Sequence, residues 1–147
     1  MEGRSRSVSY GVRILLIEPD IVLGRIYKEA LEHANHNVVW ARTAQNGLRL
    51  LDETPTDLII TELQLAAHNG IEFLYELRSY DDWQKIPVVL LTSVPQVSLV
   101  HPDTLQTNFG VVAYLYKPLT KLHDLIEAVN SLQSKTSQLD PVWSFGV

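Results

Sequence analysis

Residues 57–62 read Asp57-Leu58-Ile59-Ile60-Thr61-Glu62, and the fold can be worked out from this short stretch. Its apolar centre is too short for a helix and has no polar alternation, which predicts a strand buried on both faces of a sheet. Such strands belong to parallel sheets, because helical crossovers cover both sides. The polar Thr61 and Glu62 follow at the carboxyl end, where open α/β sheets build their sites.

Three further apolar runs have the same design. Residues 14–17 end on Glu18, residues 88–91 end on Thr92, and residues 111–116 end on Lys117. Because the carboxyl ends of parallel strands meet at one edge of a sheet, we expect a carboxylate pair, a hydroxyl and an ammonium in one cleft. This combination of groups suits a metal ion and a phosphoryl group.

Apolar residues at helical spacing separate these runs, and residues 38–41 form one more short strand. Asp20, Thr43 and Thr120 are placed to cap the first, second and last helices, and residues 103–109 predict a short helix. Strands that alternate with helices in this way predict right-handed crossovers. The expected class is therefore a three-layer α/β fold around a five-stranded parallel sheet.

Composition narrows the class of protein further. A chain of 147 residues with 46% hydrophobic content suits one compact domain, which we expect over 12–133, with an N-terminal extension at 1–11 and a flexible C-terminal tail at 134–147. The net charge of -5 and scattered basic residues disfavour direct binding to nucleic acid or a membrane. No cysteine is present, which excludes thiolate metal sites. Without a signal peptide or membrane span, a cytoplasmic protein is expected.

Over residues 12–133, the order of motifs resembles the response-regulator receiver domain of two-component signalling. The motifs are residues 14–18 for the acidic first loop, 57–62 for the phosphoacceptor strand, Gly70 for the turn before the third helix, 86–92 for the fourth strand with its hydroxyl, and 114–118 for the last strand. The resemblance implies a flavodoxin-like (βα)5 fold with strand order 2-1-3-4-5.

The resemblance also implies roles for individual residues. Glu62 falls at the position of the phosphorylated aspartate, Thr92 would contact a phosphoryl oxygen, and Lys117 would pair with the acidic site. Tyr114 takes the aromatic switch position, and the bond between Lys117 and Pro118 would be cis. A weakened magnesium site would use the oxygens of Glu18, Asp20, Glu62 and Gln64.

Three departures from the family pattern bear on this site. Glu62 is one methylene longer than aspartate, which moves the carboxylate by about an ångström and lowers phosphotransfer on the order of a hundredfold. Pro19 removes a carboxylate from the magnesium site, and Ala66 replaces a common proline. The segment 93–108 is also longer and more broken by proline than usual. Together these departures predict a pseudo-receiver that keeps the fold while losing or altering phosphotransfer.

Several hypotheses about the function stay open at this point. We expect a signalling module, not an enzyme, that binds proteins through the irregular fourth segment, the fifth strand and the last helix. Its expected partners are a histidine kinase and an output or downstream protein, with a homodimer through the last strand and helix. One alternative is a working phosphorelay receiver that uses Mg2+. A remote alternative is a flavodoxin-like ligand-binding domain, which the lack of a glycine-rich phosphate loop disfavours.

Purely structural roles for these residues also stay open. Without the resemblance, Glu62 would be explained as a strand-end carboxylate paired with Lys117, and Tyr114 can also be explained as a packing residue. Asp20 suits a helix cap better than a metal ligand. The five histidines show no spacing that would place two of them on one helical face as metal ligands, so we expect them at the surface or in loops.

Overall fold

The computed structural model describes residues 11–66, 69–99 and 103–134, so almost all of the expected extension and tail lies outside the described residues. Strands and helices alternate along the chain. They are β1 (Arg13–Ile17), α1 (Ile21–His33), β2 (Asn37–Ala41), α2 (Ala44–Glu53), β3 (Leu58–Thr61), α3 (Gly70–Arg78), β4 (Val88–Thr92), α4 (Asp103–Phe109), β5 (Val111–Tyr116) and α5 (Leu122–Ser134). Short 3-10 turns η2 (Asp81–Trp83), η3 (Gln96–Ser98) and η4 (Lys117–Leu119) lie between them.

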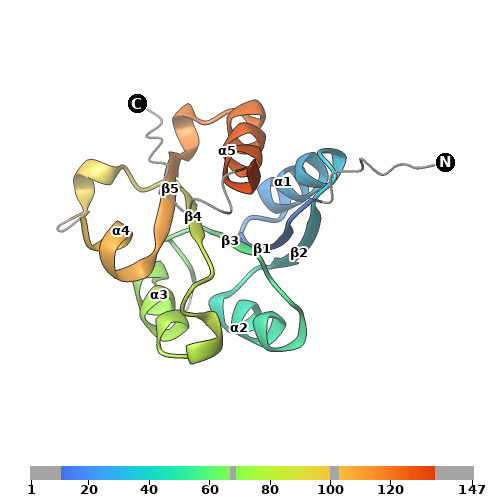
Figure 1. Cartoon of the computed structure of the whole chain (residues 1–147). Coiled ribbons are helices and arrows are strands. Elements are labelled where there is room, and N and C mark those ends of the chain that lie inside the picture. Colours follow the sequence, from blue (N-terminus) through green and yellow to red (C-terminus); the bar gives the residue numbers. More distant parts are fainter. Residues whose placement is uncertain (1–10, 67–68, 100–102, 135–147) are drawn as a thin grey trace.

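The sheet has the expected topology. Its strand order is β2-β1-β3-β4-β5, and every neighbouring pair is parallel. Helices α1 and α5 cover one face, while α2, α3 and α4 cover the other (Figure 1). The predicted three-layer, flavodoxin-like fold is therefore confirmed, and the carboxyl ends of the strands lie at one edge.

Each face of the sheet carries its own apolar core. Leu15 and Ile59 belong to the core beneath α2, α3 and α4, and neither side chain is exposed. Leu16, Ile60 and Val89 belong to the core beneath α1 and α5, with at most 1% exposure. Because neighbouring residues of a strand point to opposite faces, a continuous apolar run fills both cores. This explains why the strands show no polar alternation.

Side-chain caps set the first three helix starts. Asp20 accepts hydrogen bonds from the backbone amides of Val22 and Leu23 in α1, and Thr43 accepts one from the amide of Asn46 in α2. Asn69 and Glu72 form a reciprocal capping box at the start of α3. The carboxylate of Asp20 is therefore engaged in capping, as its position after the first apolar run indicates.

Two expectations for the loop after β5 are wrong. The bond between Lys117 and Pro118 is trans, and the pair begins the 3-10 turn η4, where the fixed φ of proline fits the backbone. Thr120 does not cap α5, since η4 delays that helix to Leu122 and the Thr120 hydroxyl donates to the Tyr116 carbonyl at 2.7 Å.

His36 lies in a loop, as expected for the histidines, but its side chain is buried. It is only 5% exposed, at the turn between α1 and β2. Its Nδ1 accepts a hydrogen bond from the Val12 amide at 3.1 Å, and its Nε2 lies 2.8 Å from Asn130 Oδ1 on α5. His33 and His123 are exposed as expected, whereas His68 and His101 lie outside the described residues.

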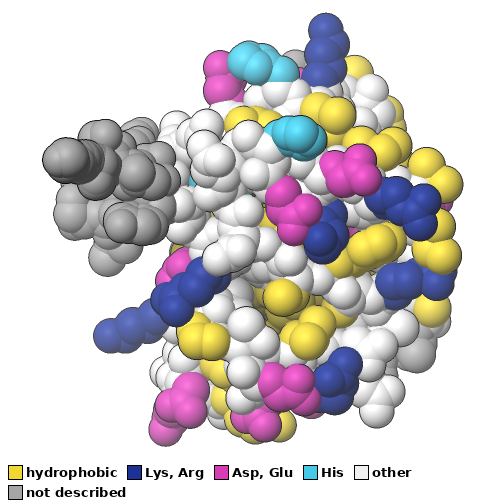
Figure 2. Space-filling model, turned by 90° about the vertical axis from the view of Figure 1, so that its right-hand side faces the viewer, with side chains coloured by type: hydrophobic (Ala, Val, Ile, Leu, Met, Phe, Trp, Pro, Cys, Tyr) yellow, Lys and Arg dark blue, Asp and Glu magenta, His cyan; other side chains and the backbone are white. Residues whose placement is uncertain are grey.

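The surface carries charges of both signs. On the face in Figure 2, which is the right-hand side of Figure 1, lysine and arginine side chains are interspersed with acidic ones. Such mixing creates no broad positive field on that face, consistent with the net charge of -5. None of the described helices has the length and apolar character that crossing a membrane requires.

Candidate functional site

Four predicted site residues meet at the carboxyl edge of the sheet. Glu18 follows β1, Glu62 follows β3, Thr92 ends β4 and Lys117 follows β5. The Lys117 ammonium lies 2.7 Å from Glu18 Oε1 and 2.7 Å from Glu62 Oε1. The two carboxylate side chains are 3% exposed and that of Lys117 is 13% exposed. The cluster is thus a buried ion triad at the place where the strand ends converge.

Hydrogen bonds occupy both oxygens of Glu62. Besides Lys117, Oε1 accepts the Ser93 amide at 3.3 Å. Oε2 accepts the Thr92 hydroxyl, the Leu63 amide at 2.6 Å and the Gln64 amide at 3.0 Å. The carboxylate is therefore held by donors from the ends of β3, β4 and β5.

The ionisation of this cluster reflects two opposing effects. Burial alone would raise the pKa of Glu62, but the hydrogen bonds from Lys117, Thr92 and Gln64 outweigh it and lower the pKa. Burial would lower the pKa of Lys117, but Glu18 and Glu62 outweigh it and raise the pKa. Glu62 is therefore an anion and Lys117 a cation at neutral pH.

Glu18 is positioned by neighbours on both sides. Its Oε2 accepts the Asp20 amide at 3.0 Å, and its backbone carbonyl accepts the indole Nε1–H of Trp40 at 3.0 Å. Trp40 was not predicted as a residue of the site. Its only signal was its place near the carboxyl end of β2, the strand beside β1.

The other two predicted metal ligands, Asp20 and Gln64, make different interactions. Asp20 caps α1, and Gln64 joins the site through its backbone amide, while its side-chain Oε1 accepts the Ser93 hydroxyl at 2.8 Å. Ser93 was not predicted, and its position directly after Thr92 is the signal that could have found it.

The donor set does not fit a magnesium ion. Mg2+ requires near-octahedral oxygen ligands, usually with one or more free carboxylates. The described oxygens of Glu18 and Glu62 already accept hydrogen bonds from Lys117, Thr92 and backbone amides. Within residues 11–66, 69–99 and 103–134, no group of three or more histidine or acidic side chains is placed to hold a metal.

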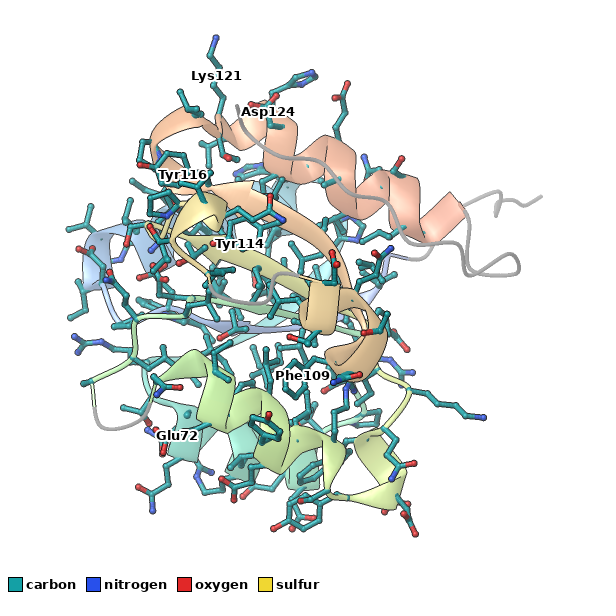
Figure 3. All side chains as sticks on the ribbon, turned by 90° about the vertical axis from the view of Figure 1, so that its left-hand side faces the viewer. Glu72, Phe109, Tyr114, Tyr116, Lys121 and Asp124 are labelled. Carbon is teal, nitrogen blue, oxygen red and sulfur yellow. The ribbon has the colours of Figure 1, made fainter. Side chains whose placement is uncertain are left out.

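A chain of hydrogen bonds leads from the acidic site to Tyr114. The Val94 amide donates to the Thr92 hydroxyl at 3.1 Å, and the Tyr114 hydroxyl donates to the Val94 carbonyl at 2.5 Å. Tyr114 is 1% exposed, and burial together with the charge of Glu62 raises its pKa to about 12. Its hydroxyl is therefore a permanent donor. Figure 3 shows Tyr114 and Tyr116 along β5.

A β-bulge determines which face Tyr114 occupies. Val88 pairs with Val111 and Val89 pairs with Ala113, so β5 carries one extra residue at this point. Without the bulge, Val111 and Tyr114 would point to opposite faces, yet both belong to the core beneath α3 and α4. The bulge thus brings the Tyr114 hydroxyl to the segment that follows β4.

A comparison with protein families identifies this arrangement. The model of the response regulator receiver domain matches residues 14–130. The chain belongs to this family. Receiver domains are signalling modules, and the response regulators that contain them interact with histidine kinases and output domains.

Known receivers and regulators are similar in sequence. A probable transcriptional regulator, ycf29 of Pyropia yezoensis, is 31% identical over 82% of this chain and 52% of its own length. The swarming motility regulation protein RssB of Serratia marcescens is 30% identical over 92% of this chain and 59% of its length. This receiver chain therefore spans between half and three fifths of these two relatives.

Solved structures give the same result for the fold. A response regulator receiver domain protein from Clostridium thermocellum is 25% identical, with a TM-score of 0.72 over 87% of this chain and 98% of that one. The chemotaxis response regulator CheY4 of Vibrio cholerae is 19% identical, with a TM-score of 0.70 over 83% of this chain and 98% of that one.

Proposed function

We propose that this receiver signals through protein–protein interaction without accepting a phosphoryl group, because Glu62 provides a permanent charge in its place. The observation that carries this proposal is the pair of contacts from one carboxylate to Thr92 and Lys117. By the family pattern, Thr92 would contact a phosphoryl oxygen and Lys117 would pair with the acidic site. Here Glu62, at the acceptor position, engages both through its longer side chain.

The state of the carboxylate supports the same proposal. A nucleophile needs a free lone pair and an open line of attack, whereas both oxygens of Glu62 accept several donors and its side chain is 3% exposed. The ion pair with Lys117 also lowers its pKa, and hence its basicity. Glu62 is therefore a poor phosphoacceptor and a good fixed anion.

A fixed anion at this position can bias the conformation of the surface that is expected to bind partner proteins. In the family, phosphorylation biases a coupled rearrangement of the hydroxyl and the aromatic residue. Here Thr92 is held by Glu62, and the hydrogen bonds through Val94 hold Tyr114 inside. One carboxylate supplies about half of the charge of a phosphoryl group. We therefore expect Thr92 and Tyr114 to be locked in one arrangement or only weakly biased toward the active one.

The expected partner surface lies where this chain of hydrogen bonds ends. Turn η3 follows Val94 and carries Val97, which is 93% exposed, and α4, β5 and α5 continue the same side. A histidine kinase, an output or downstream protein, or a second copy bound through β5 and α5 would contact this surface. We propose no direct contact with nucleic acid, because the net charge is -5.

A phosphotransfer assay tests the proposal against its main alternative, a working phosphorelay receiver. With a radiolabelled small phosphodonor and Mg2+, the full chain is expected to remain unlabelled. Glu62→Asp tests whether the extra methylene alone blocks transfer, because Pro19 and Ala66 stay unchanged. Stable, magnesium-dependent labelling of the natural chain that Glu62→Gln abolishes would overturn the proposal.

A spectroscopic test addresses the permanent bias directly. Glu62→Gln and Glu18→Gln each remove one carboxylate that contacts Lys117, but only Glu62 contacts Thr92. We expect Glu62→Gln to shift the NMR resonances of Thr92, Val94 and Tyr114, and Glu18→Gln to leave them nearly unchanged. Equal shifts in the two variants would show that Glu62 does not control the path to Tyr114.

A further inference from the structure

Strand β2 leaves one edge of the sheet open within the described residues. It pairs only with β1, and the bonds Asn37 N–H to Val12 O and Glu18 N–H to Ala41 O show which residues face that partner. In a parallel ladder the alternate residues, Val38 and Trp40, direct their backbone N–H and C=O groups outward. Such an edge is a template for one more strand.

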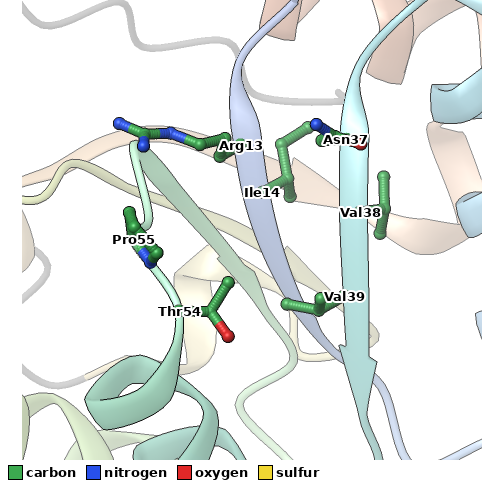
Figure 4. A pocket seen from close by; sticks show the side chains of 7 residues that line it. All are labelled: Arg13, Ile14, Asn37, Val38, Val39, Thr54 and Pro55. Atoms are coloured by element: carbon green, nitrogen blue, oxygen red, sulfur yellow. The ribbon is translucent and has the colours of Figure 1, made fainter.

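A pocket of about 270 Å³ lies over the starts of β2 and of its neighbour β1, near the end of α2. The residues that line it are Arg13, Ile14, Asn37, Val38, Val39, Thr54 and Pro55 (Figure 4). Its volume lies just below the roughly 300–1,000 Å³ of small-molecule sites, so it suits one large side chain better than a cofactor.

The lining favours an aromatic occupant. Val39 and Pro55 provide apolar contact, whereas the side chains of Ile14 and Val38 belong to the core on the opposite face of the sheet. The Arg13 guanidinium stays in place because Asp57 accepts its Nε at 2.9 Å and its Nη2 at 2.8 Å. A held guanidinium beside an apolar wall can stack on an aromatic ring, which adds about 0.5–1 kcal/mol at exposed sites.

The chain itself contains a matching segment outside the described residues. Residues 142–147 read Val142-Trp143-Ser144-Phe145-Gly146-Val147, in which apolar and small residues alternate. This period of two is typical of a strand with one apolar face, which would carry Trp143, Phe145 and Val147. The polar residues 134–138 differ from it in composition and suit a connector.

The last helix ends close to the open edge. Asn130 on α5 is hydrogen-bonded to His36, which directly precedes Asn37, the first residue of β2 and part of the pocket wall. Helix α5 ends one turn later, at Ser134. The nine residues from there to Trp143 can span about 30 Å when extended.

We propose that residues 142–147 bind their own domain as an added strand along β2, with an aromatic side chain in the pocket beside Arg13 and Val39. Main-chain hydrogen bonds to the outward groups of Val38 and Trp40 give affinity. The pocket fixes the register of the added strand, because it accepts an aromatic side chain at one position. A short connector keeps the segment at an effective concentration in the millimolar range, which favours binding within one chain. This proposal does not depend on the function assigned to Glu62.

Hydrogen exchange of the full chain tests the proposal. We compare the natural chain with a Trp143→Ser, Phe145→Ser double variant and with Ser144→Ala, a control on the opposite face of the segment. The amides of Val38 and Trp40 should exchange about tenfold faster or more in the double variant and be unchanged in the control.

A second measurement identifies the occupant. In the natural chain, nuclear Overhauser contacts should join the ring protons of Trp143 or Phe145 to Val39 and Pro55. Protection that survives in the double variant would assign the edge to another segment, such as residues 1–10, and would overturn the proposal. Protection that rises with protein concentration would assign it to a second copy and would overturn it as well.

Discussion

At the scale of single residues, one methylene group at position 62 sets the chemistry of the site. The longer arm lets one carboxylate reach Thr92 and Lys117 at once. Hydrogen bonds to a charged group contribute about 1.5–3 kcal/mol each, but burying two ions costs several kcal/mol. The two terms largely cancel, so Glu62 contributes more to a fixed geometry than to the stability of the fold.

The pH dependence of stability provides a prediction for Glu62. Its pKa in the folded protein lies below the ordinary value of 4.5, so its ionised form stabilises the fold above that pH. This contribution is lost as the pH falls through the folded pKa. Glu62→Gln should cost about 1–3 kcal/mol at neutral pH, and the difference from the natural chain should shrink below pH 4.5.

Urea unfolding between pH 7 and pH 3 measures this difference. Asp52→Asn serves as a control, because it changes an exposed carboxylate on α2. Its free energy of unfolding should stay within about 0.5 kcal/mol of the natural chain at neutral pH. A Glu62→Gln difference that grows as the pH falls would contradict the assigned role of the ion pair.

At the scale of elements, the packing of α1 on β2 depends on a glycine in the middle of a helix. A β-carbon at Gly24 would lie 2.0 Å from Cζ2 of Trp40, the residue whose indole supports Glu18. Glycine usually costs about 1 kcal/mol relative to alanine inside a helix. Here it is retained because the ring of Trp40 occupies the space that a side chain would need.

Gly24→Ala should therefore destabilise the protein despite its better helix propensity. We expect a loss of about 1–3 kcal/mol, because overpacking exceeds the gain in propensity. Thermal and urea unfolding measure it. In a Trp40→Leu background the same substitution should be neutral or stabilising, which a double-mutant cycle detects. Additive effects would show that the ring does not limit this position.

At the scale of the whole molecule, His36 joins three segments that are far apart along the chain. It connects the start of β1, the turn before β2 and the last helix through Val12 and Asn130. His36→Ala leaves the Val12 amide without this acceptor and opens a cavity, so we expect a loss of about 1–3 kcal/mol. His33→Ala, an exposed histidine on α1, should change the free energy of unfolding by less than about 0.5 kcal/mol.

Denaturant unfolding of both histidine variants provides the comparison. Hydrogen exchange adds a local readout, since the loss at His36 should appear at the starts of β1 and β2 as well as in α5. Equal stability of the two variants would mean that the network through Asn130 does not hold the segments together.

The order of elements, the parallel sheet and the meeting of Glu18, Glu62, Thr92 and Lys117 were readable from the chain, because periodicity and strand ends are local properties. The saturated oxygens of Glu62, the burial of His36 and the trans bond before Pro118 were not readable. These features arise where distant segments meet, and they depend on the reach of individual side chains. The side of the sheet on which Tyr114 lies is the clearest example. One extra residue in β5 moves its side chain to the opposite face, and no local sequence pattern indicates that bulge.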